Sequence, residues 1–299
     1  MTNSRLQRKQ QKALPTKERT QSSIIWRKFR RHKAAMVSAA VLLILTTMVF
    51  LAPWIAPYDF DEIDLPNRQE PPSLQHPLGT DDLGRDLYTR ILYGGRISIT
   101  IGLFAALAST LLGTFLGALA GFYGGAIDNA IMRFTDMAIS VPSLPLLIVL
   151  SSYSSAAIPI MILIIALLSW MSTARVVRGA VHSIKQQEFV NAAASIGGRN
   201  GYIILRHIIP NVMGPVIVGA TLGVGGAIII ESSLSFLGLG ISPPTPTWGN
   251  MLQDSQATMA SKPWLTIFPG LAILITVLCI NFLGEGLHDA LDPTLSNRG

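Results

Sequence analysis

Ionisable side chains inside apolar stretches are the residues of this chain best placed to do chemistry, because a charge at the centre of a bilayer costs about 3 kcal/mol. Three such residues are Arg133, Asp136 and Glu231. Arg133 and Asp136 would be neighbours on a helix, so we predict that they form a structural pair. Glu231 has no charged neighbour in "AIIIESSLSF". Two interpretations stay open for it: a place on a transport path, or a structural hydrogen bond to another helix or subunit.

The sequence contains no pattern of catalytic or metal-binding residues. It lacks G-x-x-x-x-G-K-[ST], the loop that cradles nucleotide phosphates. Its five histidines, at positions 32, 76, 182, 207 and 288, do not have the spacing of metal ligands. The serines of "SSYSS" (151–155) have no base nearby and indicate a short external turn, and the single Cys279 is typical of a small buried residue. We therefore expect no catalytic, cofactor-binding or metal-binding residue in this chain.

The composition is typical of a membrane protein. Hydrophobic residues make up 49% of the 299 residues and charged residues only 13%, whereas soluble domains are about 25% charged. A membrane-spanning helix needs about 20 apolar residues. Six stretches qualify: 35–55, 97–120, 134–152, 156–174, 213–236 and 264–284. The apolar core of the first is too long for a cleaved signal peptide, so we predict an uncleaved helix. Pro142 and Pro145 interrupt the third.

The distribution of Lys and Arg predicts the orientation of these spans, because cytoplasmic loops carry an excess of both residues. With the N-terminus inside, 18 of the 23 Lys and Arg residues fall on inner segments and five on outer segments. Both termini are therefore expected in the cytoplasm.

The basic N-terminal segment carries its own pattern. In "SIIWRKFRRHK", Ile25, Trp26 and Phe29 lie near one helical face, which predicts a short helix on the inner leaflet with its basic side chains at anionic headgroups. The alternative is a solvated basic run that only sets the topology. Residues 1–20 are polar and basic, and we expect them to be disordered.

Two segments at the outer surface carry further predictions. On a helix of residues 81–92 the apolar side chains share one face and the charged ones cover the rest, which predicts an amphipathic helix. Its charges would meet a binding protein or simply face water. Pro243, Pro244 and Pro246 should stiffen the external loop before Trp248, whose ring suits the membrane interface.

A cytoplasmic segment, "NAAASIGGRNGYIILRHIIPN" (191–211), is unusual for a membrane sequence. Its start predicts a short helix with Phe189, Ala193 and Ile196 on one side, ended by the Gly-Gly pair at 197–198. A second helix follows at an angle. The two helices would project into the cytoplasm with small residues between them, where another surface can approach closely. The alternative is an interfacial linker that packs against the membrane.

This segment resembles the EAA loop of ABC transporter permeases, whose pattern is Glu-Ala-Ala, a Gly four residues later, and an Ile-x-Leu-Pro ending. The matching positions are Ala192, Ala193, Gly197 and Pro210. Asn191 stands where the family most often has Glu, and Ile209 replaces the Leu. The resemblance implies that the segment, with Gly198 beside the break, is a coupling loop that docks in a groove on an ATP-binding subunit and transmits its opening and closing.

Two longer stretches resemble the C-type permeases of the peptide/nickel importer family. They are "HPLGTDDLGRDLYTRILYGGRISI" (76–99) and "ESSLSFLGLGISPPTPTWGNML" (231–252), and the likeness extends over about 24–294. It implies an all-α integral membrane protein with the fold of a type I ABC importer permease, six transmembrane helices and an N-terminal interfacial helix.

The resemblance also implies an order of parts along the chain. These are a basic cytoplasmic tail with the interfacial helix (1–33), a first transmembrane helix with an external segment (34–96), an importer transmembrane domain (97–285) that contains the coupling loop (185–211), and a cytoplasmic tail (286–299).

The implied function is that of a permease subunit in the cytoplasmic membrane, which forms half of a path for di- or oligopeptides, with nickel complexes and glutathione as alternatives. The implied partners are a B-type permease, two ATP-binding subunits that use ATP and Mg, an extracellular solute-binding protein and the lipid bilayer, with no nucleic acid. A secondary carrier would need paired intramembrane carboxylates or an inverted repeat of broken helices, and an intramembrane enzyme would need a nucleophile and base within the spans. The sequence shows neither pattern.

Overall fold

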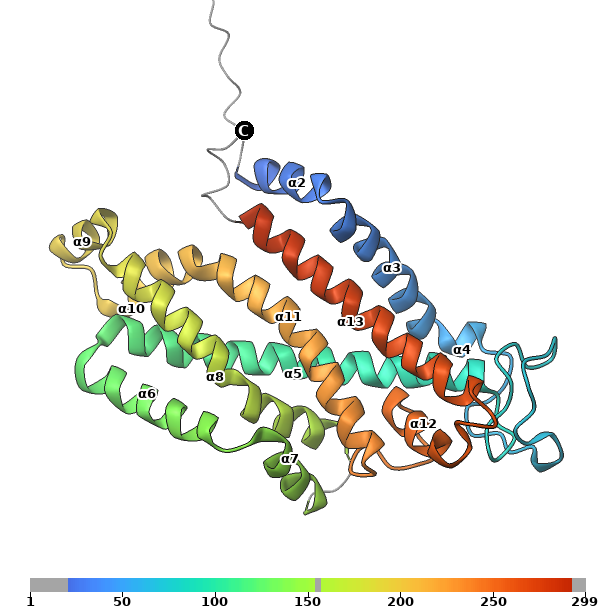
Figure 1. The fold of residues 1–299 in the computed structure, drawn as a ribbon. Helices are drawn as coiled ribbons and strands as arrows, with labels where there is room; N and C mark the ends of the chain where they lie inside the picture. The colour runs from blue at the N-terminus through green and yellow to red at the C-terminus, as the bar shows by residue number, and fades with distance from the viewer. Residues whose placement is uncertain (1–20, 154–156, 292–299) are drawn as a thin grey trace, which may run out of the picture.

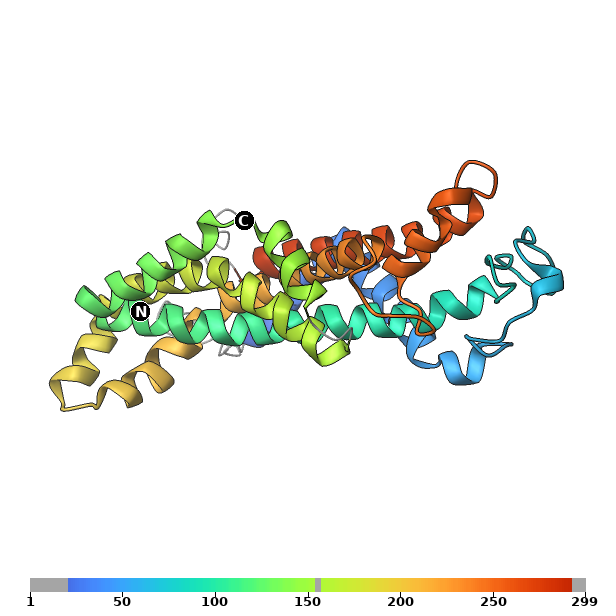
Figure 2. The same cartoon turned by 90° about the horizontal axis from the view of Figure 1, so that it is seen from below.

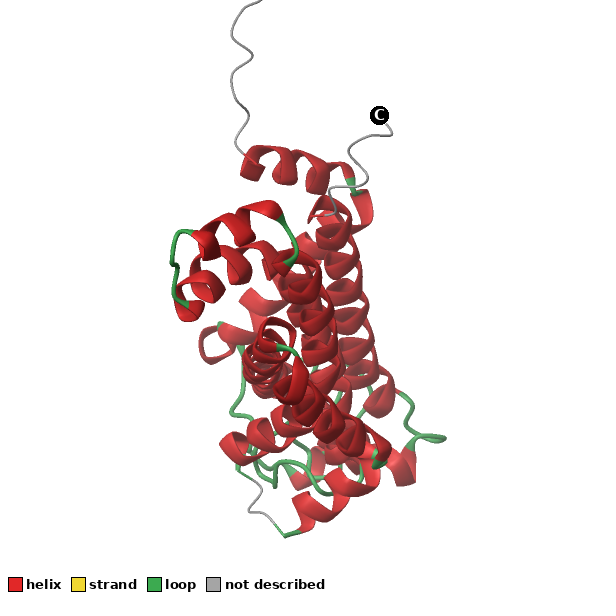
Figure 3. Ribbon diagram, turned by 90° about the vertical axis from the view of Figure 1, so that its left-hand side faces the viewer, coloured by secondary structure: helices red, strands yellow, loops and turns green. Residues whose placement is uncertain are grey.

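The structure is a computed structural model that describes residues 21–153 and 157–291, and every regular element in these ranges is a helix (Figures 1 and 3). In chain order the elements are α2 (Gln21–Arg31), α3 (Lys33–Phe50), α4 (Ala52–Ile55), η1 (Leu65–Asn67), α5 (Leu87–Tyr123), α6 (Gly125–Ser140), α7 (Ser143–Ser152), α8 (Ile158–Lys185), α9 (Glu188–Ser195), α10 (Asn200–Ile203), η2 (Ile204–Ile208), α11 (Ile209–Phe236), α12 (Trp248–Ser255), η3 (Gln256–Thr258) and α13 (Trp264–Leu291). The predictions for residues 1–20, for the end of "SSYSS" and for the C-terminal tail from residue 292 lie outside the described residues.

Five helices are long and apolar enough to cross a membrane: α3, α5, α8, α13, and a continuous helix of residues 200–236 that contains α10, η2 and α11. Counted as one span, α6 and α7 supply a sixth, bent by 82°. The bend falls at Val141 and Pro142, because proline disfavours a helical conformation in the residue before it. The predicted all-α fold with six spans is therefore confirmed, with the third span a bent pair that begins before residue 134.

The long helix α5 runs almost the full length of the molecule, and α8 lies along it (Figures 1 and 2). Gly113, Gly117 and Gly121 are four residues apart on α5 and face α8. A Cβ atom added at these glycines would lie 2.5 to 2.7 Å from carbonyl oxygens of α8, so the two backbones are in direct contact. Small residues at a four-residue interval allow this approach in membrane helices, where close packing replaces the hydrophobic effect as the source of association.

The N-terminal helices α2 and α3 lie along α13 (Figure 1). Phe29 is 7% exposed and packs with Ala35 and Ala290, and Ile25 packs against the same cluster. Trp26 is 58% exposed, and its ring stacks on that of Phe29 with 6.0 Å between the ring centroids. The three side chains therefore lie near one helical face, as predicted, with Ile25 and Phe29 packed in the cluster and Trp26 outside it.

The predicted amphipathic helix of residues 81–92 is wrong. The helix begins at Leu87, and Asp86 caps its start by accepting a hydrogen bond from the Thr89 N–H at 2.8 Å. Before it the chain turns through Gly84, whose φ is +79°. The Asp81 carboxylate is buried in this turn and lies 2.7 Å from the Arg85 guanidinium. The cap at Asp86 and the left-handed Gly84 prevent the helix from starting earlier, although the sequence pattern there is amphipathic. The charged side chains turn inward and pair with one another.

The Trp248 ring is buried inside the protein and does not face the membrane as the sequence prediction implied. Its side chain is 1% exposed and its indole N–H donates to the Ile91 carbonyl at 3.0 Å. The ring rests on Gly95, where an added Cβ would lie 2.6 Å from it. A capping box between Thr247 and Asn250 starts α12 directly before this contact. Trp248 therefore fastens α12 to the first part of α5.

Replacing Gly117 by Val should prevent the close approach of α5 and α8. Its side chain would collide with the Ala174 carbonyl, and overpacking of this kind typically costs about 1–3 kcal/mol. We expect a lower melting temperature and less assembled protein in membranes, measured by fluorescence-detected size exclusion after heating. Gly179→Ala on α8 is the matched control, because an added Cβ there meets nothing within 4 Å. Equal melting temperatures for Gly117→Val and the wild type would contradict the contact.

Candidate functional site

The segment 185–211 forms a bend that projects from one end of the molecule, opposite the end that carries α12 (Figures 1 and 2). Helix α9 ends at Ser195, and Gly197, two residues further on, has a φ of +86°. The Gly198 N–H donates to the Ala193 carbonyl and the Gly197 N–H to the Ala194 carbonyl, the two bonds of a Schellman helix end. Gly198 has no room for a side chain, since an added Cβ would lie 2.7 Å from the Ala193 carbonyl oxygen. The predicted helix–glycine–helix geometry is therefore present.

Helix α9 meets the core through one side only. Val190 and Ala193 point into a core cluster with α5, α8 and α11, whereas Phe189 is 44% and Ile196 89% exposed. Asn191 and Ala192 are exposed as well. Of the three residues predicted on one side of this helix, only Ala193 is buried, and Ile196 lies one residue beyond the end of α9. The projecting tip keeps small and apolar side chains uncovered.

The second half of the segment continues into α11 without a stop. Residues 204–208 form a π-helical turn, in which the Ile209 N–H donates to the Ile204 carbonyl. Pro210 follows directly and stands in the first turn of α11, as predicted. However, α11 does not start a new helix there, because it continues α10. Proline has no N–H and its ring would clash with a carbonyl one turn earlier, and the wider π turn accommodates both effects. Ile209 is partly buried and Pro210 is exposed.

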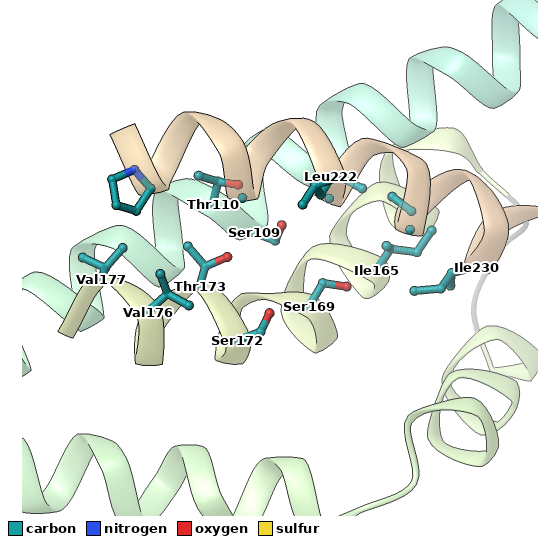
Figure 4. A pocket seen from close by; sticks show the side chains of 16 residues that line it. Ser109, Thr110, Ile165, Ser169, Ser172, Thr173, Val176, Val177, Leu222 and Ile230 are labelled. Atoms are coloured by element: carbon teal, nitrogen blue, oxygen red, sulfur yellow. The ribbon is translucent and has the colours of Figure 1, made fainter. Parts of the chain in front are cut away.

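A cavity of about 310 Å³ lies between α5, α8 and α11 (Figure 4). Its polar lining consists of hydroxyls: Ser109 and Thr110 of α5, and Ser169, Ser172 and Thr173 of α8. Helix α11 contributes three glycines and four apolar side chains, those of Pro215, Leu222, Ala227 and Ile230. None of the described residues that line the cavity carries a charge. The cavity offers hydrogen-bond donors and acceptors to a solute without favouring a charged one. No local sequence motif indicated this cavity.

Glu231 is completely buried and lies outside the lining of this cavity. Its carboxylate accepts a hydrogen bond from Ser98 Oγ of α5 at 2.9 Å and one from Ser235 Oγ at 2.7 Å. Ser98 Oγ in turn accepts a hydrogen bond from the backbone N–H of Trp248 in α12 at 3.3 Å. Of the two interpretations left open for Glu231, the structure favours the hydrogen bond to another helix.

Asp136 does not pair with Arg133. It accepts a hydrogen bond from Arg175 Nη2 of α8 at 2.6 Å, and in the part of the chain that the structure describes Arg133 makes no ion pair. Asp128 of the same helix accepts two hydrogen bonds from Arg178 of α8. Helix α6 lies beside α8, so Asp128 and Asp136 pair with arginines of α8 and not with residues of α6. Nothing in the local sequence indicates these pairs, because the partners are 39 and 50 residues apart.

Known proteins are similar in sequence to this chain over nearly its whole length. Residues 113–297 match the family of binding-protein-dependent transport system inner membrane components, and residues 20–72 match the N-terminal transmembrane domain of oligopeptide transport permease C. The glutathione transport system permease proteins GsiD of Escherichia coli O157:H7 and of Shigella sonnei (strain Ss046) are each 43% identical to this chain over 282 residues, 94% of this chain and 93% of the relative.

The chain therefore belongs to the family of binding-protein-dependent transport system inner membrane components, as a C-type permease of the peptide/nickel ABC importers. The predicted membership is confirmed. The relatives are membrane subunits of transport systems, which agrees with the expectation of a transporter subunit and not an enzyme.

Replacing Glu231 by Leu should destabilise the packing of α5, α11 and α12. It leaves the buried hydroxyls of Ser98 and Ser235 without their acceptor, and an unsatisfied buried polar group costs about 1–3 kcal/mol. Glu231→Gln should retain most of the stability, because an amide can accept from one hydroxyl and donate to the other. Thermal stability of the purified complex and uptake across external pH would be measured.

Ser233→Ala is the control for the Glu231 variants, because Ser233 on the same helix donates only to the Ile229 carbonyl of its own turn. Near-complete loss of uptake in Glu231→Gln at normal stability, with a steep pH dependence in the wild type, would instead support a proton-carrying role.

Proposed function

We propose that this chain imports small peptides or peptide-like solutes, and that segment 185–211 receives the motion of an ATP-binding subunit. The observation that carries the proposal is the exposed tip around Ile196, an apolar side chain 89% exposed on a rigid bend at one end of the molecule. Exposed apolar side chains on a defined projection are typical of a docking site for another protein. Family membership supports an ATPase as that protein.

The tip is connected directly to the cavity. Helix α8 runs into α9 with only Gln186 and Gln187 between them, and α10 continues through the π turn into α11. The Lys185 ammonium donates to the Phe122 carbonyl at 2.6 Å and ties the base of the bend to α5. The three helices that meet at the bend are the same three that line the cavity. A displacement of the tip therefore changes the walls of the cavity without passing through a flexible loop.

The uncharged, hydroxyl-lined cavity supports a peptide cargo. Peptide groups need donors and acceptors, and hydroxyls supply both. The similar permeases of Escherichia coli and Shigella are named for glutathione, itself a small peptide, so glutathione and di- or oligopeptides are the proposed cargo. The site would be completed by a B-type permease as second half of the path, two ATP-binding subunits that use ATP and Mg, and a solute-binding protein at the outer end.

Replacing Gly197 by Val should uncouple transport from ATP hydrolysis. A β-branched side chain strains the positive φ of +86° and should deform the bend, although an added Cβ meets no atom within 4 Å. Gly197→Asn should retain function, because Asn tolerates this conformation. We expect at least tenfold lower cargo-stimulated ATPase activity and uptake of labelled glutathione and dipeptides for the Val variant, at normal assembly.

Gly201→Ala serves as the control for the bend, since Gly201 is exposed, has a negative φ and has no neighbour for an added Cβ. Normal stimulation in Gly197→Val would remove segment 185–211 from the coupling role. Normal coupling with a different labelled solute would keep the role and change the cargo.

We further propose that both termini and the segment 185–211 are cytoplasmic, as the Lys and Arg distribution predicts. In a Cys279→Ala background, single cysteines at Leu65 and Ser195 place a thiol at the two ends of the molecule. A membrane-impermeant maleimide should label the Leu65→Cys variant in intact cells and the Ser195→Cys variant only after permeabilisation. The reverse pattern would invert the topology.

A further inference from the structure

A groove at the outer part of the molecule takes no part in the function proposed above. It lies between the end of α3, the loop after α4, the first turns of α5 and the loop before α12, and has a volume of about 660 Å³. Four aromatic rings line it, those of Phe50, Phe60, Tyr93 and Phe104. Among the described residues that line the groove, Arg96 is the only charged one. The groove is therefore apolar with a single cation.

Arg96 differs from the other arginines at the start of α5. Arg85 and Arg90 are buried and lie 2.7 and 3.3 Å from the Asp81 carboxylate. Arg96 is exposed and makes no ion pair within the ranges 21–153 and 157–291. Its guanidinium is consequently available to an anion from outside the chain.

The depth of Arg96 matches the headgroup region of the outer leaflet. It directly precedes the predicted span 97–120. Ala52 of α4 packs in one cluster with Leu92 of α5, and Trp54 of α4 is 80% exposed, a residue type enriched at membrane interfaces. Arg96 follows Leu92 by about one helical turn, so it lies close to the level of α4.

An apolar wall leads from Arg96 toward the bilayer centre. Thr100, Leu103 and Phe104 follow on the same face of α5, and Leu103 and Phe104 are 42% and 52% exposed. From Arg96 to Phe104 the helix rises about 12 Å, at about 1.5 Å per residue. That length fits within one leaflet of a hydrocarbon core about 30 Å thick.

We propose that this groove binds a glycerophospholipid of the outer leaflet, with its phosphate on Arg96 and an acyl chain along Leu103 and Phe104. A guanidinium matches the geometry of phosphate oxygens with two parallel hydrogen bonds. A helix of a partner subunit would have to bring a carboxylate to Arg96 at headgroup depth, whereas a phospholipid carries its phosphate at that depth. The charge of Arg96 and the apolar wall together select the lipid.

The test uses the assembled complex with its partner subunits, purified in mild detergent and titrated with phosphatidylglycerol in native mass spectrometry. Arg96→Gln should weaken binding of the tightest phosphatidylglycerol about fivefold, the contribution of one basic residue near a membrane surface. Arg96→Lys should retain most of the binding. Thr100→Trp, which fills the groove and leaves Arg96 in place, should also lose it. Arg68→Gln, at an exposed external arginine outside the groove, is the matched control.

Three results would overturn the proposal. Equal phosphatidylglycerol binding by the wild type and Arg96→Gln would show that Arg96 holds no lipid. Loss of the partner permease from both Arg96→Gln and Thr100→Trp would make the groove a contact between subunits. Displacement of the lipid by millimolar inorganic phosphate would identify a site for a free anion.

Discussion

The end of the molecule that carries α12 depends on one constraint: a polar group that cannot reach water must find its partner inside the protein. Glu231 meets it with hydroxyls from its own helix and from α5, and one of those hydroxyls also receives the first N–H of α12. A single carboxylate thereby joins α5, α11 and α12. The buried Trp248 ties α12 to α5 a second time, and the Asp81 pairs tie the turn before α5 to that helix. This end is held together by polar contacts in fixed directions, which resist sliding.

The half of the molecule nearer the bend of residues 185–211 is held by a different means. Glycines of α5 bring its backbone against α8, and this contact allows no change in separation without collision or an open gap. On the other side of the cavity, α11 presents Gly219, Gly223 and Gly226, where an added Cβ would meet nothing within 4 Å or only the Ala106 side chain at 3.6 Å. The walls of the cavity therefore differ: α5 and α8 are in backbone contact, whereas α11 has space at its glycines.

Features encoded within a few neighbouring residues were predictable from the sequence. The apolar spans, the break at Pro142 and the helix end at Gly197 each follow from local composition, and the structure contains all three. Features that join distant residues were not: the sequence suggested Arg133 for Asp136, but tertiary packing supplied Arg175. Residues 81–92 were predicted wrongly although the sequence carried a signal for the correct helix start. Asp86 is a strong helix cap and Gly84 a typical turn residue. The hydroxyl-lined cavity combines three helices and has no signature in any one of them.

The continuity of residues 200–236 has a mechanical consequence. A rod of this many helical residues pinned near Glu231 acts as a lever whose long arm, from Asn200 to the pin, measures about 46 Å at about 1.5 Å per residue. Gly223, at the middle of the cavity wall, stands only about 12 Å from the same pin. Under the proposed coupling, a stroke delivered at the Asn200 end arrives at the cavity reduced about fourfold in amplitude and raised by the same factor in force. The lever then converts a large movement of a docked partner into a small, strong adjustment at the walls of the cavity.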